Sequence, residues 1–173
     1  ISAQSFQDFD VHILVNNSTD SSYEICSNFC SSRPNFSVID LEDSCSSLPD
    51  VLNFGIRRLR NRCEYVVRHD ADDYMLPNRL LDTYQSISSS PSRPLIHGGN
   101  AYTNHTKNLY FPPNSLSDLQ IKSALLLYSP FIHPSIALRS NIPHLYDTRF
   151  VYAQDLKLFI DNIFSGFYSI SPK

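Results

Sequence analysis

Three aspartates, Asp70, Asp72 and Asp73, stand within four residues of the chain, directly after an apolar stretch. Like charges this close repel one another, so the group implies a bound cation, a shared proton or full exposure to water. Asp70 and Asp72 are two residues apart and would point to the same side of an extended chain. Carboxylate oxygens arranged in this way suit Mg²⁺ or Mn²⁺, which bind few protein carboxylates and complete their coordination with water and phosphate.

A solvated turn is the alternative interpretation, because aspartate favours turns and helix N-termini. The flanking sequence favours the metal site. Residues 64–68 are expected to form a mostly buried strand, and Pro77 to begin a helix with apolar residues at helical spacing, namely Leu80, Leu81, Tyr84 and Ile87. The aspartates therefore follow a strand in an alternating pattern of strands and helices. Open α/β sheets bind ligands at the carboxyl ends of their strands.

Strands and helices alternate along most of the chain. The apolar runs predict strands at 11–15, 36–41, 64–68, 95–102 and 135–139. Helical spacing predicts helices from Ser21 to before Arg33, at 49–62, 77–87 and 115–128, and from Gln154 to before Gly166. Ser21 and Glu24 have the spacing of a capping box. Gly98 and Gly99 predict either a β-bulge or a close approach of two backbone segments.

The composition is that of one globular domain. A chain of 173 residues that is 42% hydrophobic and 18% charged can bury a core, so residues 1–173 are expected to form a single domain. A net charge of -3 without a basic run argues against nucleic acid as a partner. The longest apolar run, 123–138, contains two prolines and a histidine and is too short to span a bilayer. We expect a cytoplasmic protein, with the inner face of the membrane as the other possible location.

The cysteines do not have the spacing of a zinc site. Cys26 and Cys30 fall on one face of an expected helix, and Cys45 and Cys63 stand apart from them and from each other. We expect thiols buried in the core of a protein from a reducing compartment.

Six segments, taken in order, resemble those of inverting family 2 glycosyltransferases of the GT-A fold, especially the members that make bacterial polysaccharide and lipopolysaccharide. The resemblance covers nearly the whole chain, and it depends on the order and spacing of the segments more than on any one of them. The segments are residues 2–9, Asn17-Ser18-Thr19-Asp20, Leu52-Asn53-Phe54-Gly55-Ile56, residues 68–80, His133-Pro134-Ser135, and Ala153-Gln154-Asp155 with Leu158.

The resemblance implies a Rossmann-like three-layer α/β/α fold around a mostly parallel mixed sheet. The family's first strand, a central strand of that sheet, has no counterpart before Ile1, and the end of the family's domain has none after Lys173. We therefore expect an incomplete domain whose first strand is missing. Absence of a central strand would leave unpaired backbone groups on its neighbours.

The resemblance also implies a nucleoside diphosphate sugar as donor, a UDP-sugar foremost, and a hydroxyl of a glycan or lipid-linked molecule as acceptor, in cell-envelope polysaccharide synthesis. Asp70, Asp72 and Asp73 would hold Mn²⁺ or Mg²⁺, which neutralises the departing diphosphate. Asp155 would take the proton of the acceptor hydroxyl. Association with a membrane, through segments outside this chain, is left open.

Further site residues follow from the same resemblance. Asn16, Arg68, Asp70 and Asp72 would bind the donor, and His133 and Gln154 would lie on the acceptor side. Asn16 stands where the family usually has an acidic residue that reads the nucleobase, and Gln154 replaces the usual glutamate beside the base.

Ordinary structural roles compete with these assignments. Asp155 would also stabilise a helix N-terminus. His133 beside a proline turn would equally be a hydrogen-bonded structural histidine. Arg68 and Arg79 would pair with the neighbouring aspartates, which their spacing favours over a phosphate contact. Asp20 would either contact the nucleotide or cap a helix, and we favour the cap.

Two other functions fit parts of the sequence. A non-catalytic, degenerate homologue that binds nucleotide sugars would explain the departure at Val15-Asn16-Asn17, where Val15 stands out, and the missing strand. A metal-dependent phosphotransferase would use Asp70 as a nucleophile and pass through an aspartyl phosphate.

Overall fold

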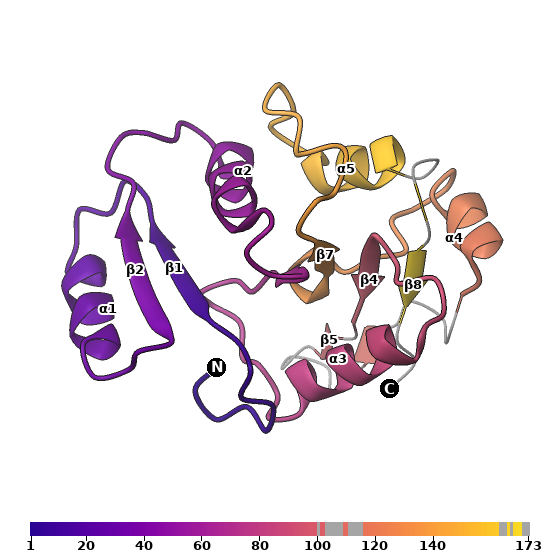
Figure 1. Cartoon of the computed structure of the whole chain (residues 1–173). Coiled ribbons are helices and arrows are strands. Elements are labelled where there is room, and N and C mark those ends of the chain that lie inside the picture. The colour runs from indigo at the N-terminus through magenta and orange to yellow at the C-terminus, as the bar shows by residue number, and fades with distance from the viewer. Residues whose placement is uncertain (100, 103–108, 111–115, 163–165, 167, 171–173) are drawn as a thin grey trace.

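The computed structural model describes residues 1–99, 101–102, 109–110, 116–162, 166 and 168–170 (Figure 1). The described strands are β1 (Val11–Val15), β2 (Phe36–Asp40), β3 (Tyr65–Val67), β4 (Ile96–Gly98), β5 (Ala101–Tyr102), β6 (Leu109–Tyr110), β7 (Ala137–Arg139) and β8 (Tyr168–Ile170). The described helices are α1 (Ser22–Cys30), α2 (Leu48–Leu59), α3 (Arg79–Ser89), α4 (Asp118–Ala124), α5 (Gln154–Asn162) and the 3-10 turn η1 (His133–Ser135). The expected alternation of strands and helices is therefore present.

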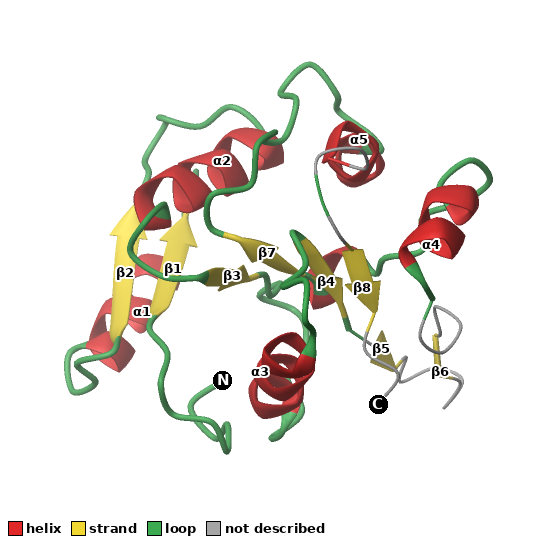
Figure 2. Cartoon of the chain, turned by 45° about the vertical axis from the view of Figure 1, so that its right-hand side comes forward, coloured by secondary structure: helices red, strands yellow, loops and turns green. Residues whose placement is uncertain are grey.

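The amino-terminal part is built on a parallel pair of strands. β1 and β2 run side by side, with Val11 opposite Phe36 and Val15 opposite Asp40. Helices α1 and α2 lie on opposite faces of this pair (Figures 1 and 2). A Cβ atom at Gly55 of α2 would meet Leu14 of β1 at 3.1 Å, so the glycine lets the helix approach the strand closely despite its low helix propensity.

The second sheet has the strand order β3-β7-β4-β8. β7 is antiparallel to both β3 and β4, and only the β4–β8 pairing is parallel. Helix α5 lies on one side of this sheet and α3 on the other (Figure 2). The prediction of one mostly parallel sheet is wrong for the described strands: β1–β2, the four-stranded sheet and the β5–β6 ribbon are separate. The four-stranded sheet is not mostly parallel, because β7 runs antiparallel to both of its neighbours.

The core lies where this second sheet meets α2, α4 and α5. The side chains of Phe159, Ile96 and Ile136 are fully buried there. The other members of this cluster are Ile56, Leu95, Ile121, Leu125, Phe131, Leu138, Ile142, Tyr146 and Leu158. The described part of α1, in contrast, contains no buried residue, so its apolar stripe contributes little to the core.

Several helix ends differ from the sequence-based expectation. Ser21 makes no side-chain cap; instead Asp20 Oδ1 accepts the Ser22 N–H at 2.9 Å, because a carboxylate is the stronger acceptor. The alternative that Asp20 caps this helix is thus confirmed. α4 is shorter than expected and begins with a capping box between Ser117 and Gln120.

At Gly99 the predicted close approach of two backbone segments is confirmed. Its amide N–H donates to Ser135 Oγ at 3.3 Å, and that hydroxyl donates to the Gly99 carbonyl at 2.8 Å. A Cβ atom at Gly99 would meet the Ser135 carbonyl oxygen at 3.0 Å. The contact joins the end of β4 to the η1 segment, which carries His133.

The cysteines follow the expectation in part. Cys45 is buried and Cys26 and Cys30 are half-buried, but Cys63 is exposed at the end of the turn after α2. All four thiols are free. None of the described helices is long and apolar enough to cross a membrane.

His97 should make the fold sensitive to acid. Its side chain is 1% exposed in β4, and this burial lowers its pKa to about 4. Between that value and its ordinary pKa of 6.5 the unfolded chain binds a proton that the folded chain does not, so stability falls as the pH falls. We expect a shift from pH 7 to pH 5 to reduce the free energy of unfolding by about 2 kcal/mol through this residue. Urea unfolding of the parent and of His97→Gln at both pH values measures this loss of stability. An equal pH dependence of the unfolding free energy in the two proteins would contradict the prediction.

Candidate functional site

Arg68 is the first residue after β3, and its side chain is 10% exposed. Its backbone N–H donates to the Ile136 carbonyl at 3.0 Å, which extends the pairing of β3 with the η1–β7 segment by one residue. Its Nη2 lies 2.7 Å from Asp70 Oδ1. The expected pairing of Arg68 with a neighbouring aspartate is confirmed.

The remaining N–H groups of Arg68 point to a ligand. Nε and Nη1 are buried and have no hydrogen-bond partner within the described residues. Buried donors of a charged group are costly to leave unpaired, and nearly all such groups in folded proteins have a partner. A planar guanidinium whose Nε and Nη1 are both free to donate fits the oxygens of a carboxylate or phosphate. The free hydrogen-bond donors of Arg68 therefore suit the binding of an anion.

Arg79, the first residue of α3, ties the aspartate segment to the η1 turn. Its Nη2 donates to the carbonyl oxygens of Arg68 at 3.0 Å and of Pro134 at 3.1 Å. Burial lowers the pKa of Arg79 to about 10, with Asp73 opposing the shift and Arg68 adding to it. The expectation that Arg79 pairs mainly with aspartates is corrected: within the described residues its side chain donates to carbonyl oxygens and, at 3.4 Å, contacts His69 Nδ1.

His133 forms a hydrogen-bonded pair with a buried tyrosine. Its Nε2 lies 2.7 Å from the hydroxyl oxygen of Tyr146, whose side chain is 3% exposed. The Tyr146 backbone is held in both directions by Asn53 of α2: Asn53 Nδ2 donates to the Tyr146 carbonyl at 2.8 Å, and the Tyr146 N–H donates to Asn53 Oδ1 at 2.9 Å. The expectation of a hydrogen-bonded histidine beside the proline turn is met.

Electrostatic effects show which charged groups surround this pair. Burial lowers the pKa of His133, Arg68 lowers it further, and Asp155 and Asp70 oppose the shift. Burial likewise raises the pKa of Tyr146, with Arg68 opposing the shift and Asp155 and Asp70 adding to it. The fold therefore brings Arg68, Asp70, His133 and Asp155 into one region, although they come from three distant parts of the chain.

Asp155 is in the first turn of α5, directly after Gln154, and both residues are half-buried. Ala153, which precedes them, has a φ of 54°, in the left-handed region that non-glycine residues rarely adopt. This backbone conformation sets the direction in which α5 begins. This position at the N-terminus of α5 also fits the alternative role of Asp155, which is to stabilise the end of the helix.

The expected metal ligands do not gather. Asp72 and Asp73 are exposed in the turn after Asp70, and Asp70 is engaged by Arg68. In the part of the chain that the structure describes, no group of three or more His, Cys, Asp or Glu side chains could hold a metal ion. The expected three-carboxylate site is thus not assembled. What is present fits a cation held by one or two carboxylates together with substrate oxygens.

Asn16 follows β1 at the carboxyl end of the other sheet. Its Nδ2 donates to the Cys45 carbonyl at 3.2 Å, and its Oδ1 is buried without a partner among the described residues. An unpaired amide oxygen is suited to accept an N–H from a ligand.

Comparison with protein families relates this site to a known activity. The model of glycosyl transferase family 2 matches residues 1–156. The chain belongs to this family. Family membership supports glycosyltransferase activity, with a nucleotide-sugar donor and an acceptor. Comparison with curated proteins found no match.

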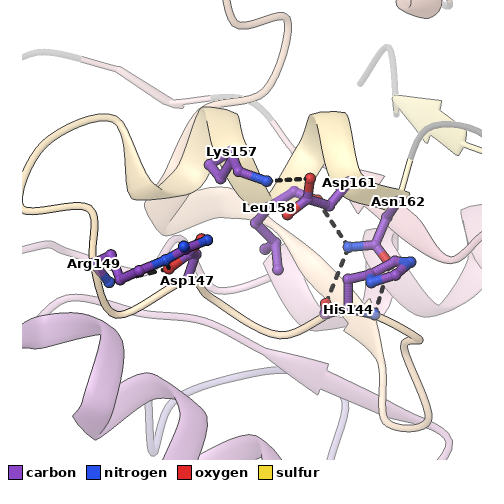
Figure 3. A network of polar contacts seen from close by, with 7 residues as sticks. All are labelled: His144, Asp147, Arg149, Lys157, Leu158, Asp161 and Asn162. Carbon is purple, nitrogen blue, oxygen red and sulfur yellow. Dashed lines mark hydrogen bonds and ion pairs between the residues drawn. The ribbon is translucent and has the colours of Figure 1, made fainter.

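The candidate site is supported by polar residues that the sequence analysis did not single out. Asn162 of α5 accepts the His144 N–H through Oδ1 at 3.1 Å and donates through Nδ2 to the His144 carbonyl at 3.0 Å (Figure 3). Asn53 does the same for Tyr146, so residues 144–146 are held from α2 and from α5. Both asparagines interrupt apolar helix faces, three residues before Ile56 and after Phe159, and this is the signal that could have revealed them.

Arg68, Asp70, His133 and Asp155 line neither of two open surface depressions, whereas Cys45, whose carbonyl accepts the Asn16 amide, lines the second. Their volumes are about 570 and 520 Å³, and residues between 44 and 64 and at 139–141 line them. Arg57 and Arg58 of α2, and Arg62 in the turn that follows this helix, are exposed there.

Proposed function

We propose that this protein transfers a sugar from a nucleoside diphosphate donor, a UDP-sugar foremost, to a hydroxyl of a glycan or lipid-linked acceptor, with inversion, in cell-envelope polysaccharide synthesis. The observation that carries the proposal is the buried Arg68, whose Nε and Nη1 have no partner in the described structure. Arg68 and Asp155 both act electrostatically on His133. An anionic donor on Arg68 would thus sit close to a carboxylate that can take a proton. Residues 1–173 would all belong to one catalytic domain.

In the proposed reaction the donor diphosphate accepts hydrogen bonds from Arg68 Nε and Nη1, while Asp70 holds the guanidinium through Nη2. The acceptor hydroxyl oxygen attacks the anomeric carbon from the face opposite the diphosphate. The new carbon–oxygen bond forms as the bond to the β-phosphate breaks, and the electron pair leaves with the diphosphate. Asp155 takes the hydroxyl proton. A single displacement of this kind inverts the anomeric configuration.

The proposed cation would be Mn²⁺ or Mg²⁺. Asp72, which is exposed, and Asp70 would hold it, with Asp73 beside them, and the donor oxygens would complete its coordination. When bound, such an ion neutralises charge on the diphosphate.

The remaining residues would recognise the substrates. Asn16 Oδ1, which lacks a partner in the described structure, would accept a hydrogen bond from the nucleobase. His133, held by Tyr146, and Gln154, directly before Asp155, would contact the acceptor.

Donor binding tests the proposal. Titration calorimetry with UDP-, GDP- and dTDP-sugars, with and without Mn²⁺, should show binding of one donor class, and Asp72→Ala should remove the Mn²⁺ dependence. Arg68→Met should weaken that binding by about 10- to 100-fold, because each hydrogen bond to a charged group contributes about 1.5–3 kcal/mol. Arg93→Met is the control, since Arg93 is exposed and pairs with Glu64. Absence of donor binding by the folded parent, or unchanged affinity in Arg68→Met, would overturn the proposal.

A further inference from the structure

We infer that Tyr146 is a positioning residue for the transfer: its hydroxyl holds the single ring proton of His133 on Nδ1, so that His133 donates a hydrogen bond to a substrate oxygen. The inference rests on the proposed function for its catalytic consequence. The proton arrangement itself rests on the hydrogen bond between the two side chains and on their burial.

The geometry allows two arrangements of protons. Tyr146 Oη and His133 Nε2 are 2.7 Å apart, and either atom could be the donor. Tyr146 is 3% exposed. Within the described residues, the Tyr146 hydroxyl has one hydrogen-bond partner, His133. If His133 donated from Nε2, the buried O–H would have no acceptor there. If Tyr146 donates, both the O–H and the Nε2 lone pair are satisfied, which is the rule for buried polar groups.

A neutral imidazole has one N–H group, so donation by Tyr146 to Nε2 places that proton on Nδ1. The groups facing the ring favour this neutral form. Burial and the nearby Arg68 lower the pKa of His133, and the opposing effects of Asp155 and Asp70 do not cancel them. His133 is therefore a hydrogen-bond donor at neutral pH and cannot also remove a proton through Nε2.

The surrounding structure fixes the position of the pair. Asn53 bonds both backbone groups of Tyr146, so the phenol cannot shift without breaking two buried hydrogen bonds. The His133 ring centroid lies 5.5 Å from that of Tyr146 and 6.4 Å from that of Phe159. Such support from a hydrogen-bonding partner behind a ligand-contacting histidine sets its tautomer and orientation.

This arrangement divides two tasks between His133 and Asp155. Asp155 accepts the proton of the acceptor hydroxyl, and the Nδ1–H of His133 binds an oxygen with a lone pair. That oxygen belongs either to the acceptor hydroxyl or to the donor diphosphate, and both accept the same hydrogen bond. The two possibilities can be distinguished, because loss of the His133 Nδ1–H weakens binding of only one substrate. That substrate is the acceptor in the first case and the nucleotide sugar in the second.

The test uses Tyr146→Phe, which removes only the hydroxyl, with Tyr65→Phe as matched control because the Tyr65 hydroxyl donates to the Pro94 carbonyl at 2.7 Å. Nitrogen-15 spectra of histidine-labelled protein should show His133 of the parent and of Tyr65→Phe protonated on Nδ1. In Tyr146→Phe the ring should become a mixture of tautomers and its pKa should rise, because a hydrogen bond to the neutral form is lost. A parent spectrum with the proton on Nε2, or an unchanged spectrum in Tyr146→Phe, would overturn the inference.

Kinetics supply the second readout. We expect Tyr146→Phe to lower kcat/KM by roughly ten-fold, as for loss of one neutral hydrogen bond in the transition state. A rise in KM for the acceptor assigns the bound oxygen to the acceptor hydroxyl, and weaker donor binding assigns it to the diphosphate. Unaltered kcat and KM values alongside a changed spectrum would refute the positioning role. A parent that shows the expected tautomer but binds no donor would refute the proposed function and leave the proton arrangement intact.

Discussion

Replacing Asp155 with asparagine is expected to lower the rate of sugar transfer by about 10²- to 10⁴-fold, the usual contribution of a positioned general base. The amide keeps the shape of the carboxylate and its place in the first turn of α5, but it cannot accept the acceptor proton. Donor affinity should stay unchanged, since the proposed diphosphate contacts come from Arg68 and not from α5. The loss should therefore appear in kcat and not in donor binding.

Single-turnover transfer with the donor identified by calorimetry measures this effect. Asp161→Asn is the matched control, because Asp161 lies on the same helix and pairs with Lys157 on the helix surface. A variant at position 155 that keeps more than a tenth of the parent rate would show that another group takes the proton. Loss of donor binding together with activity would instead make Asp155 a structural residue of the helix N-terminus.

The second large effect concerns stability. Asn53→Ala should reduce the free energy of unfolding by about 3–5 kcal/mol, because it leaves the N–H and carbonyl of Tyr146 buried without partners and opens a small cavity. The side chain of Asn53 is 2% exposed, so water cannot easily replace it. Asn162→Ala should have an effect of similar size, since Asn162 bonds His144 in the same two directions and also the Leu158 carbonyl.

Urea unfolding followed by circular dichroism measures both variants. Asn78→Ala is the control: Asn78 is exposed, precedes α3 and makes no side-chain cap, so its loss should change stability by less than about 0.5 kcal/mol. A cost below about 1 kcal/mol for Asn53→Ala would mean that residues 144–146 are held mainly by their apolar contacts.

The expected effects of Asp155→Asn and Asn53→Ala both arise in the segment 133–155. Residues 133–155 supply His133, Tyr146 and Asp155, and the asparagines of α2 and α5 hold its middle part in place. Arg79 fixes its beginning through the Pro134 carbonyl. The reacting groups are thus placed by hydrogen bonds to backbone atoms, which do not depend on the side chains that react.

Short-range patterns were sufficient for much of the fold. The runs at 11–15 and 36–41 became β1 and β2, because apolar residues bounded by turn residues form strands wherever a neighbour is available. Helical spacing located α2, α3 and α5 within a few residues. It failed for the length of α4, where Leu126 and Leu127 are exposed and the apolar run does not continue the helix. β8 was missed, because its three residues carry no pattern by themselves.

The sequence by itself determined the family, the kinds of groups available for chemistry and their places at the ends of strands and helices, because these follow from residue type and local spacing. Only the tertiary structure decided how those groups meet. Asn53 and Tyr146 are 93 residues apart, and Arg79 and Pro134 are 55 apart, so no local pattern relates them. The pairing of Arg68 with Asp70 left Nε and Nη1 of the guanidinium buried without a partner among the described residues, and the same turn kept Asp72 and Asp73 in solvent. Such outcomes depend on which backbone and side-chain atoms compete for each donor, and that competition exists only once the chain is packed.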